Sequence, residues 1–171
     1  MSTSTEHELT TPGPLSSRVL QEGYGPGAWH GPDFKAALAD VTPELAFRRP
    51  APGRHNIAEI ALHHAYYVRS VRTQLSSRPA DPFVLSGDDW FELNDEQRLS
   101  WARIRTTLES EQQRLVTVIT DIEGGRAVSA VSADDRFGLV LGITCHAIYH
   151  AGQVQLIKRL LQGASAHGID S

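Results

Sequence analysis

Residues 142–161 read GITCHAIYHAGQVQLIKRLL. The apolar residues of this stretch recur every three or four positions, which predicts a helix with one face directed at a core. His146 and His150 lie four residues apart, so their side chains stack on one face of that helix. Both imidazoles are therefore expected to point into the protein interior. The apolar residues that share their hemisphere are Leu139, Ile143, Ala147, Val154, Ile157 and Leu161.

The helix that carries these two histidines is expected over residues 136–162, with Gly163 ending it in a left-handed conformation. A second helix is expected over residues 56–78, because Asn56 and Glu59 have the spacing of a capping box. Two adjacent histidines, His63 and His64, lie on this second helix. Its apolar stripe consists of Ile57, Ile60, Ala61, His64, Val68, Val71 and Leu75.

Two further helical regions are expected. One runs from residue 94 or 95 to residue 122 and is ended by Gly124 and Gly125. The other spans residues 15–45, where glycines and prolines between residues 23 and 32 break it into two short helices. With almost no strand signal elsewhere, the sequence predicts an all-α bundle of three long helices and one broken one. The inward residues of the third region are Trp101, Ile104, Leu108, Leu115, Val118 and Ile122.

Aromatic residues outside these stripes have expected packing roles. Phe83, Trp90 and Phe91 belong to the loop 79–93 and are expected to pack as a lid over one end of the bundle. Trp29 and Trp101 are expected to anchor the core.

The composition is that of one domain without disulfides. The chain has 171 residues, 16 basic and 20 acidic, with a formal charge of −4, and so offers no basic surface to nucleic acid. Its single cysteine, Cys145, excludes an internal disulfide, and we interpret it as a small core residue. No stretch resembles a signal peptide or a membrane span, which predicts a cytoplasmic protein without membrane contact. The domain is expected over residues 14–163, between a flexible tail at 1–13 and a short tail at 164–171.

The histidines are the residues that point to chemistry. If an imidazole of the second helix faces His146 and His150, the three rings form a metal site with an open coordination position. Such sites are typical of catalytic zinc, although histidine nitrogens also suit nickel, copper and iron. The alternative is that these are ordinary core histidines, each with a hydrogen-bond partner. Spacing alone admits either His63 or His64 as the third ring.

Two motifs resemble those of a known family. HAIYHAGQ at residues 146–153 resembles the signature of the DinB-like (damage-inducible, YfiT-type) superfamily of four-helix bundles. HNIAEIALHHA at residues 55–65 resembles the other motif of that family, in which an apolar run leads into a ligand histidine. The order of parts also agrees, since GAWH at 27–30, the Asp89-Trp90 pair and the helix opened by Trp101 follow in sequence. The resemblance covers residues 15 to 162 and implies a four-helix bundle with a broken first helix and long connecting loops.

The resemblance also implies a divalent metal ion, commonly zinc or nickel, held by three histidines. By position these are His63, His146 and His150. His64 stays an alternative, because it follows His63 directly and lies at the centre of the apolar stripe. We favour His63, because an open site lies at a cleft between helices rather than on the central line of the core. One turn either side of His63, Glu59 and Tyr67 are expected near the ligand.

Three functions fit this reading. The superfamily is similar to enzymes that use mycothiol or bacillithiol, which implies a metal-dependent thiol S-transferase acting on small electrophiles. The alternatives are a metal-dependent hydrolase, with His64 or Glu59 as a candidate catalytic base, and a non-enzymatic metal-binding or ligand-binding stress protein. Arg48, Arg49 and Arg54 are candidate partners for the carboxylates of a thiol.

Two properties of the whole protein are also expected. The family resemblance implies a homodimer, because bundles of this family often pair, and an exposed apolar strip on the broken first helix or on the third helix would need covering. Metal binding is expected to weaken below about pH 6, because each ligand histidine must be neutral to bind.

Overall fold

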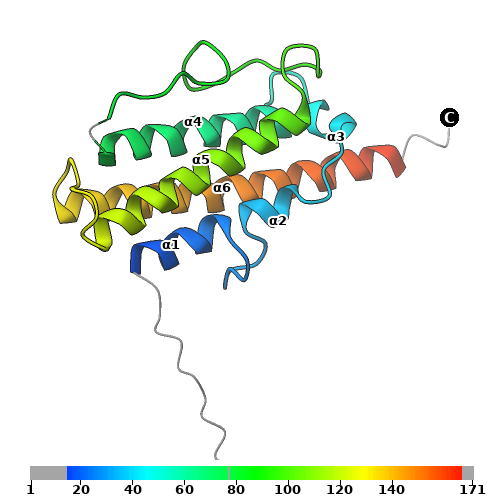
Figure 1. The fold of residues 1–171 in the computed structure, drawn as a ribbon. Helices are drawn as coiled ribbons and strands as arrows, with labels where there is room; N and C mark the ends of the chain where they lie inside the picture. The colour runs from blue at the N-terminus through cyan, green and yellow to red at the C-terminus, as the bar shows by residue number, and fades with distance from the viewer. Residues whose placement is uncertain (1–14, 77, 167–171) are drawn as a thin grey trace, which may run out of the picture.

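The computed structural model describes residues 15–76 and 78–166. Within these residues the chain forms six helices and no strand, which confirms the predicted all-α class (Figure 1). The expected tail at residues 1–13 and residues 167–171 of the expected second tail lie outside the described residues. The helices are α1 (Leu15–Tyr24), α2 (Phe34–Leu38), α3 (Pro43–Phe47), α4 (Ile57–Ser76), α5 (Trp101–Glu123) and α6 (Ala133–Ala166).

The long helices α4, α5 and α6 form three rods of a four-helix bundle, and α1 followed by α2 takes the place of the fourth (Figure 1). α4 packs against both α5 and α6, and α1 packs against α6 and α5. α2 continues along α6, and α3 lies against α4. The first region is therefore broken, as the sequence predicts, but into three short helices rather than two, because Thr42 caps a separate helix that starts at Pro43.

The start of α4 is fixed by the predicted capping box. The Glu59 backbone N–H donates to Asn56 Oδ1 at 2.9 Å, and the Asn56 N–H donates to Glu59 Oε2 at 3.3 Å. These two bonds satisfy backbone donors that a helix start leaves without partners. They fix the residue at which α4 begins, two turns before His63.

Most predicted core residues are buried. Trp101 is buried as expected, and its indole N–H donates to the Val41 carbonyl oxygen at 2.8 Å. On α5, Val118 and Ile122 are only half-buried, and Ile119 takes the fully buried position between them. As expected of a lid, Phe91 is buried, and it packs with Phe83 against Tyr66 of α4. The other buried α5 positions include Ile104, Leu108 and Leu115.

Gly23 is a contact residue rather than a helix breaker, because α1 continues through it to Tyr24. A Cβ at position 23 would lie 2.9 Å from both the Ala147 Cβ and the Thr144 carbonyl oxygen. The missing side chain therefore lets α1 approach α6 directly beside His146.

Three predicted helix boundaries are wrong. α5 begins at Trp101 rather than at residue 94 or 95, because the Ser100 hydroxyl accepts from the Arg103 N–H and caps the helix there. α6 begins at Ala133 rather than 136, because Ser132 accepts from the Asp135 N–H. α6 also continues through Gly163 to Ala166, since Gly163 does not adopt the positive φ of a helix-ending glycine.

Two predicted core residues are wrong as well. Trp29 is 92% exposed, because it belongs to the turn between α1 and α2 rather than to either helix. Cys145 is exposed on α6, since it lies about 100° around the helix from His146, on the side away from the core. No described helix is long and apolar enough to cross a membrane.

Candidate metal centre

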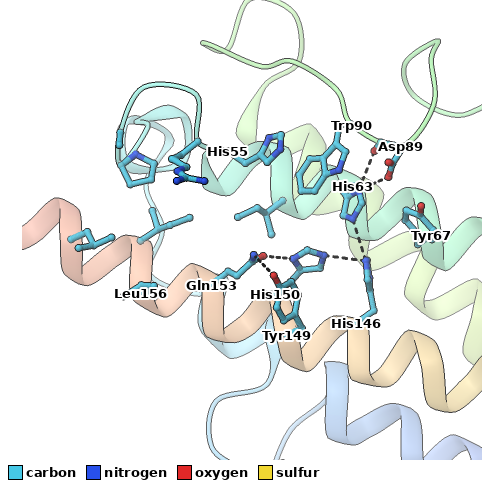
Figure 2. A pocket seen from close by; sticks show the side chains of 16 residues that line it. His55, His63, Tyr67, Asp89, Trp90, His146, Tyr149, His150, Gln153 and Leu156 are labelled. Atoms are coloured by element: carbon cyan, nitrogen blue, oxygen red, sulfur yellow. Dashed lines mark hydrogen bonds and ion pairs between the residues drawn. The ribbon is translucent and has the colours of Figure 1, made fainter.

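α4 and α6 bring three imidazoles together where they face each other. The Nε2 atom of His146 lies 3.2 Å from Nε2 of His63 and 3.1 Å from Nε2 of His150 (Figure 2). One ligand atom from each ring lies within 4.8 Å of the other two. The spacing of four residues on α6 and the rotation of α4 together produce this convergence. The structure thus brings together His63, His146 and His150, the three residues favoured on sequence.

The second nitrogen of each ring has its own partner. Nδ1 of His63 lies 3.2 Å from the carbonyl oxygen of Asp89 and 2.9 Å from its carboxylate oxygen Oδ1. Nδ1 of His150 lies 2.6 Å from Gln153 Oε1 (Figure 2). These oxygens can only accept, so both Nδ1 atoms carry the hydrogen, and both Nε2 atoms present a lone pair to the centre.

His64 does not join the three converging nitrogens. It is fully buried, and its Nδ1 lies 2.8 Å from Nδ1 of His146. Its ring packs edge-on against Phe34 of α2, and its Nε2 has no hydrogen-bond partner. The central position of His64 in the apolar stripe therefore places it behind His146, as the neighbour of that ring.

The histidines of this centre are held neutral. Burial and the neighbouring imidazoles of His150 and His63 lower the pKa of His146 to about 3. Burial lowers the pKa of His150 to about 4 and also lowers that of His63. Neutral rings are the form that binds metal. Because the pKa values of these rings are lowered, we expect protons to compete with a metal ion at a lower pH than the value of about 6 expected from unperturbed imidazoles.

The donor set fits a divalent ion of the zinc or nickel type. Nitrogens about 2.0–2.1 Å from a tetrahedral ion lie roughly 3.3 Å from one another. The observed separations of 3.1 and 3.2 Å to His146 are close to this value. A hydrogen-bond acceptor behind each ligand histidine is also the usual arrangement around protein-bound metals. His63, His146 and His150 are therefore the residues that would hold the ion.

The loop between α4 and α5 supplies two further residues of the site, Asp89 and Trp90. Asp89, which contacts His63, has a φ of 60°, a left-handed conformation that is rare for residues other than glycine. The Trp90 indole lies between two imidazoles, 3.7 Å from the ring centroid of His55 and 3.8 Å from that of His63. The sequence feature that pointed to these two residues was the Asp89-Trp90 pair of the family resemblance. The spacing of residues along the chain does not show which helix a loop lies against.

A cavity of about 710 Å³ opens beside the three histidines. Its volume lies in the range of sites for small organic molecules. Tyr67 of α4 and Arg54 of the preceding loop also line it. The apolar part of the wall consists of Pro50, Ala51, Ile60, Trp90, Tyr149, Leu156, Ile157 and Leu160.

Glu59 is engaged away from this cavity. Its carboxylate accepts from the Arg49 guanidinium, from the Leu93 N–H at 3.0 Å and from the capping N–H of Asn56. His55 Nδ1 lies 3.0 Å from the same carboxylate. Glu59 thus holds together the start of α4, the loop before it and the end of the lid. Tyr67, by contrast, contacts the rings of both His63 and His146.

The fold and the site define a class of protein, an all-helical bundle with a three-histidine group that could bind a metal ion. Residues 28–154 match the family model of the DinB superfamily, DinB_2, and the chain therefore belongs to the DinB superfamily, whose members are four-helix bundles. No curated protein and no solved structure matches the chain.

Proposed function

We propose that this protein is a divalent-metal-dependent transferase that joins a low-molecular-weight thiol to small apolar electrophiles. The supporting observation is that three neutral imidazole nitrogens open onto a largely apolar cavity. The one carboxylate in the cavity wall, Asp89, lies against Nδ1 of His63.

A zinc or nickel ion on these nitrogens would supply a Lewis acid that lowers the pKa of a bound thiol. The chain itself keeps the three rings neutral through burial, and it fixes their directions through Asp89, His64 and Gln153. Neutral ligands leave the charge of a divalent ion undiminished. This charge favours an anionic sulfur nucleophile.

The transfer needs little further acid–base help. The thiol gives its proton to solvent, and a sulfur lone pair forms a bond to the electrophilic carbon. The bond from that carbon to the leaving group breaks, and its electron pair stays on the leaving group. Trp90, Tyr149 and Ile157 line the cavity where an apolar electrophile would lie and would exclude water from it.

A hydrolase is the weaker alternative, because it needs a base to accept a proton from water. Of the two candidates, His64 is fully buried behind His146, and the carboxylate of Glu59 is occupied by Arg49 and by backbone N–H groups. Neither lines the cavity.

Bacillithiol or mycothiol is the thiol class that the family resemblance suggests, and both carry polar groups beyond the sulfur. Arg54 lines the cavity and is the guanidinium we assign to a carboxylate of the thiol or of the electrophile. Arg49 is already paired with Glu59 and does not serve this role.

The test is a conjugation assay with a panel of thiols and an apolar aryl or alkyl halide. The protein is assayed as purified, after chelation and after reloading with zinc or nickel. We expect thiol-dependent product that chelation abolishes and reloading restores, and no product from a His150→Ala variant. Product formed from water alone would favour the hydrolase. A metal-loaded protein without turnover of any pair would favour a non-enzymatic metal-binding role.

A further inference from the structure

The outer side of α6 has the composition of a buried surface. Residues 137–157 include no aspartate, glutamate, lysine or arginine, although 21% of the chain is charged. A helix that is apolar on all sides is normally covered on all sides. α6 is covered on one side, where it packs against α1, α2 and α4 (Figure 1).

Large apolar side chains are concentrated on the uncovered side. Ten large hydrophobic residues are exposed in the described part of the chain, and five of them belong to α6. At 3.6 residues per turn, Leu141, Tyr149, Leu156 and Leu160 lie within about 100° of one another around the helix axis, on the side opposite the core. Cys145 lies in the same sector, and Phe137 lies beside it. We call this surface the α6 outer face. Its large side chains, 43–65% exposed, are Phe137, Leu141, Tyr149, Leu156 and Leu160.

Three glycines lie on the same face. A Cβ added at Gly138, Gly142 or Gly152 would meet no atom within 4 Å. A glycine inside a helix costs about 1 kcal/mol relative to alanine. Unlike Gly23, none of the three is required by close packing within the described chain. Glycines in this position allow the backbone of another helix to approach closely.

Charges lie only at the two ends of the face, and they have opposite signs. Asp134 and Asp135 begin α6, and the exposed Arg159 lies near its other end. Two copies of α6 packed antiparallel would bring these ends together, whereas parallel packing would join like charges. If the two-fold axis of an antiparallel pair passes between residues 146 and 147, Asp134 of one copy faces Arg159 of the other. Phe137 then faces Leu156 of the second copy.

We propose that the α6 outer face is the interface of a homodimer in which α6 packs antiparallel against α6 of a second copy. The five exposed side chains form an apolar patch on the order of a few hundred Å², the scale that marks protein interaction sites. A stable dimer buries roughly 800 Å² per partner, and the glycine backbone, Cys145 and the end charges contribute further area. This face is on the last helix, not on the first or third helix as expected from sequence.

Such a dimer would also change the candidate metal centre. Tyr149, Leu156 and Leu160 belong both to the α6 outer face and to the cavity wall. The second copy would therefore cover part of the open side of the cavity and limit what can enter it. The proposal stands independently of the metal and of the proposed transferase, because it rests on the outer face alone.

Sedimentation velocity across micromolar concentrations tests the proposal. We expect the wild type at twice the chain mass of 18.8 kDa. Leu141→Glu places a charge in the interface without touching the cavity wall, and this variant should sediment as a monomer. Val128→Glu is the matched control, because Val128 is 91% exposed and lies in the loop before α6. The control should remain a dimer. Circular dichroism confirms that each variant is folded.

Two further measurements test the antiparallel arrangement. Cys145 is the only cysteine, and it lies near the centre of the face, so a short bis-maleimide should crosslink two wild-type chains and fail with Cys145→Ser. Asp134→Lys should weaken the dimer, and adding Arg159→Asp should restore it. A monomeric wild type, or a dimer that Leu141→Glu leaves intact, would overturn the proposal. A dimer without Cys145 crosslinking or charge rescue would overturn the antiparallel packing.

Discussion

At the scale of single residues, the candidate metal centre depends on how His146 is held. The other two rings have oxygen acceptors behind them, which fix the hydrogen on Nδ1. His146 has only the Nδ1 atom of His64, at 2.8 Å. A metal ion on Nε2 of His146 requires the hydrogen on Nδ1, and His64 must then accept it. His64 is thus a positioning residue for the ligand ring.

Replacing His64 therefore tests this contact. We expect His64→Leu to weaken zinc binding about 10- to 100-fold, the usual effect of losing a partner behind a ligand histidine. His64→Asn places an acceptor near the same point and should restore most of the affinity. Competition with a chromogenic chelator measures both constants. Equal zinc affinity of His64→Leu and the wild type would rule out the positioning role.

The ligand histidines themselves give a simpler prediction. His146→Ala or His150→Ala should abolish stoichiometric metal while leaving the helical circular-dichroism signal nearly unchanged. The reason is that the core is built from apolar faces and does not need an ion to fold, unlike a zinc finger. Elemental analysis beside thermal melts checks both parts, with His30→Ala as a control outside the site. A wild type that unfolds on chelation alone would contradict this expectation.

At the scale of elements, the position of His146 and His150 depends on how closely α6 packs. α4 holds His63 toward them through its contact with α6. On the other side, α1 approaches α6 closely enough that Gly23 has no room for a side chain. The site is therefore built between elements whose spacing is set by residues that never touch it.

Gly23→Ala tests that spacing. The new Cβ would meet the Ala147 Cβ and the Thr144 backbone at 2.9 Å, so overpacking should destabilise the fold by about 1–3 kcal/mol. Gly163→Ala is the matched control, because Gly163 is helical with open space around it and the change should be neutral or slightly stabilising. Urea unfolding measures both. A neutral Gly23→Ala would show that α1 can shift without cost.

At the scale of the whole molecule, the cluster of neutral histidines makes folding depend on pH. In the metal-free protein, burial lowers the pKa of His146 to about 3 and that of His150 to about 4, whereas unfolded histidines titrate near pH 6.5. Below that pH the unfolded chain binds more protons than the folded one. The contribution of these rings to stability is therefore present above pH 6.5 and is lost as the pH falls.

Chelator-treated protein should accordingly lose stability between pH 6.5 and 5, before most carboxylates begin to titrate. The measurement is the free energy of unfolding in urea at several pH values across this window. A His146→Gln, His150→Gln double variant lacks two of the titrating groups and should show a shallower dependence. Equal slopes for the variant and the wild type would mean that these two pKa values are not lowered by folding.

The helical class, the start of α4 and the pair of histidines on α6 can all be predicted from the sequence. These features are local, because helical periodicity, a capping box and a spacing of four residues are complete within one segment. The family motifs could also be recognised from the sequence, since they lie in two continuous stretches at residues 55–65 and 146–153.

Features that depend on contacts between distant segments could not be predicted and follow from the tertiary structure. His63 and His64 are adjacent in the sequence. The packing of α4 against α6 directs His63 to the centre and places His64 behind His146. The lowered pKa values follow from burial, which no spacing reveals. Cys145 looked like a core residue because its neighbours are apolar. It is exposed because α6 is apolar on both sides and the described residues cover only one side.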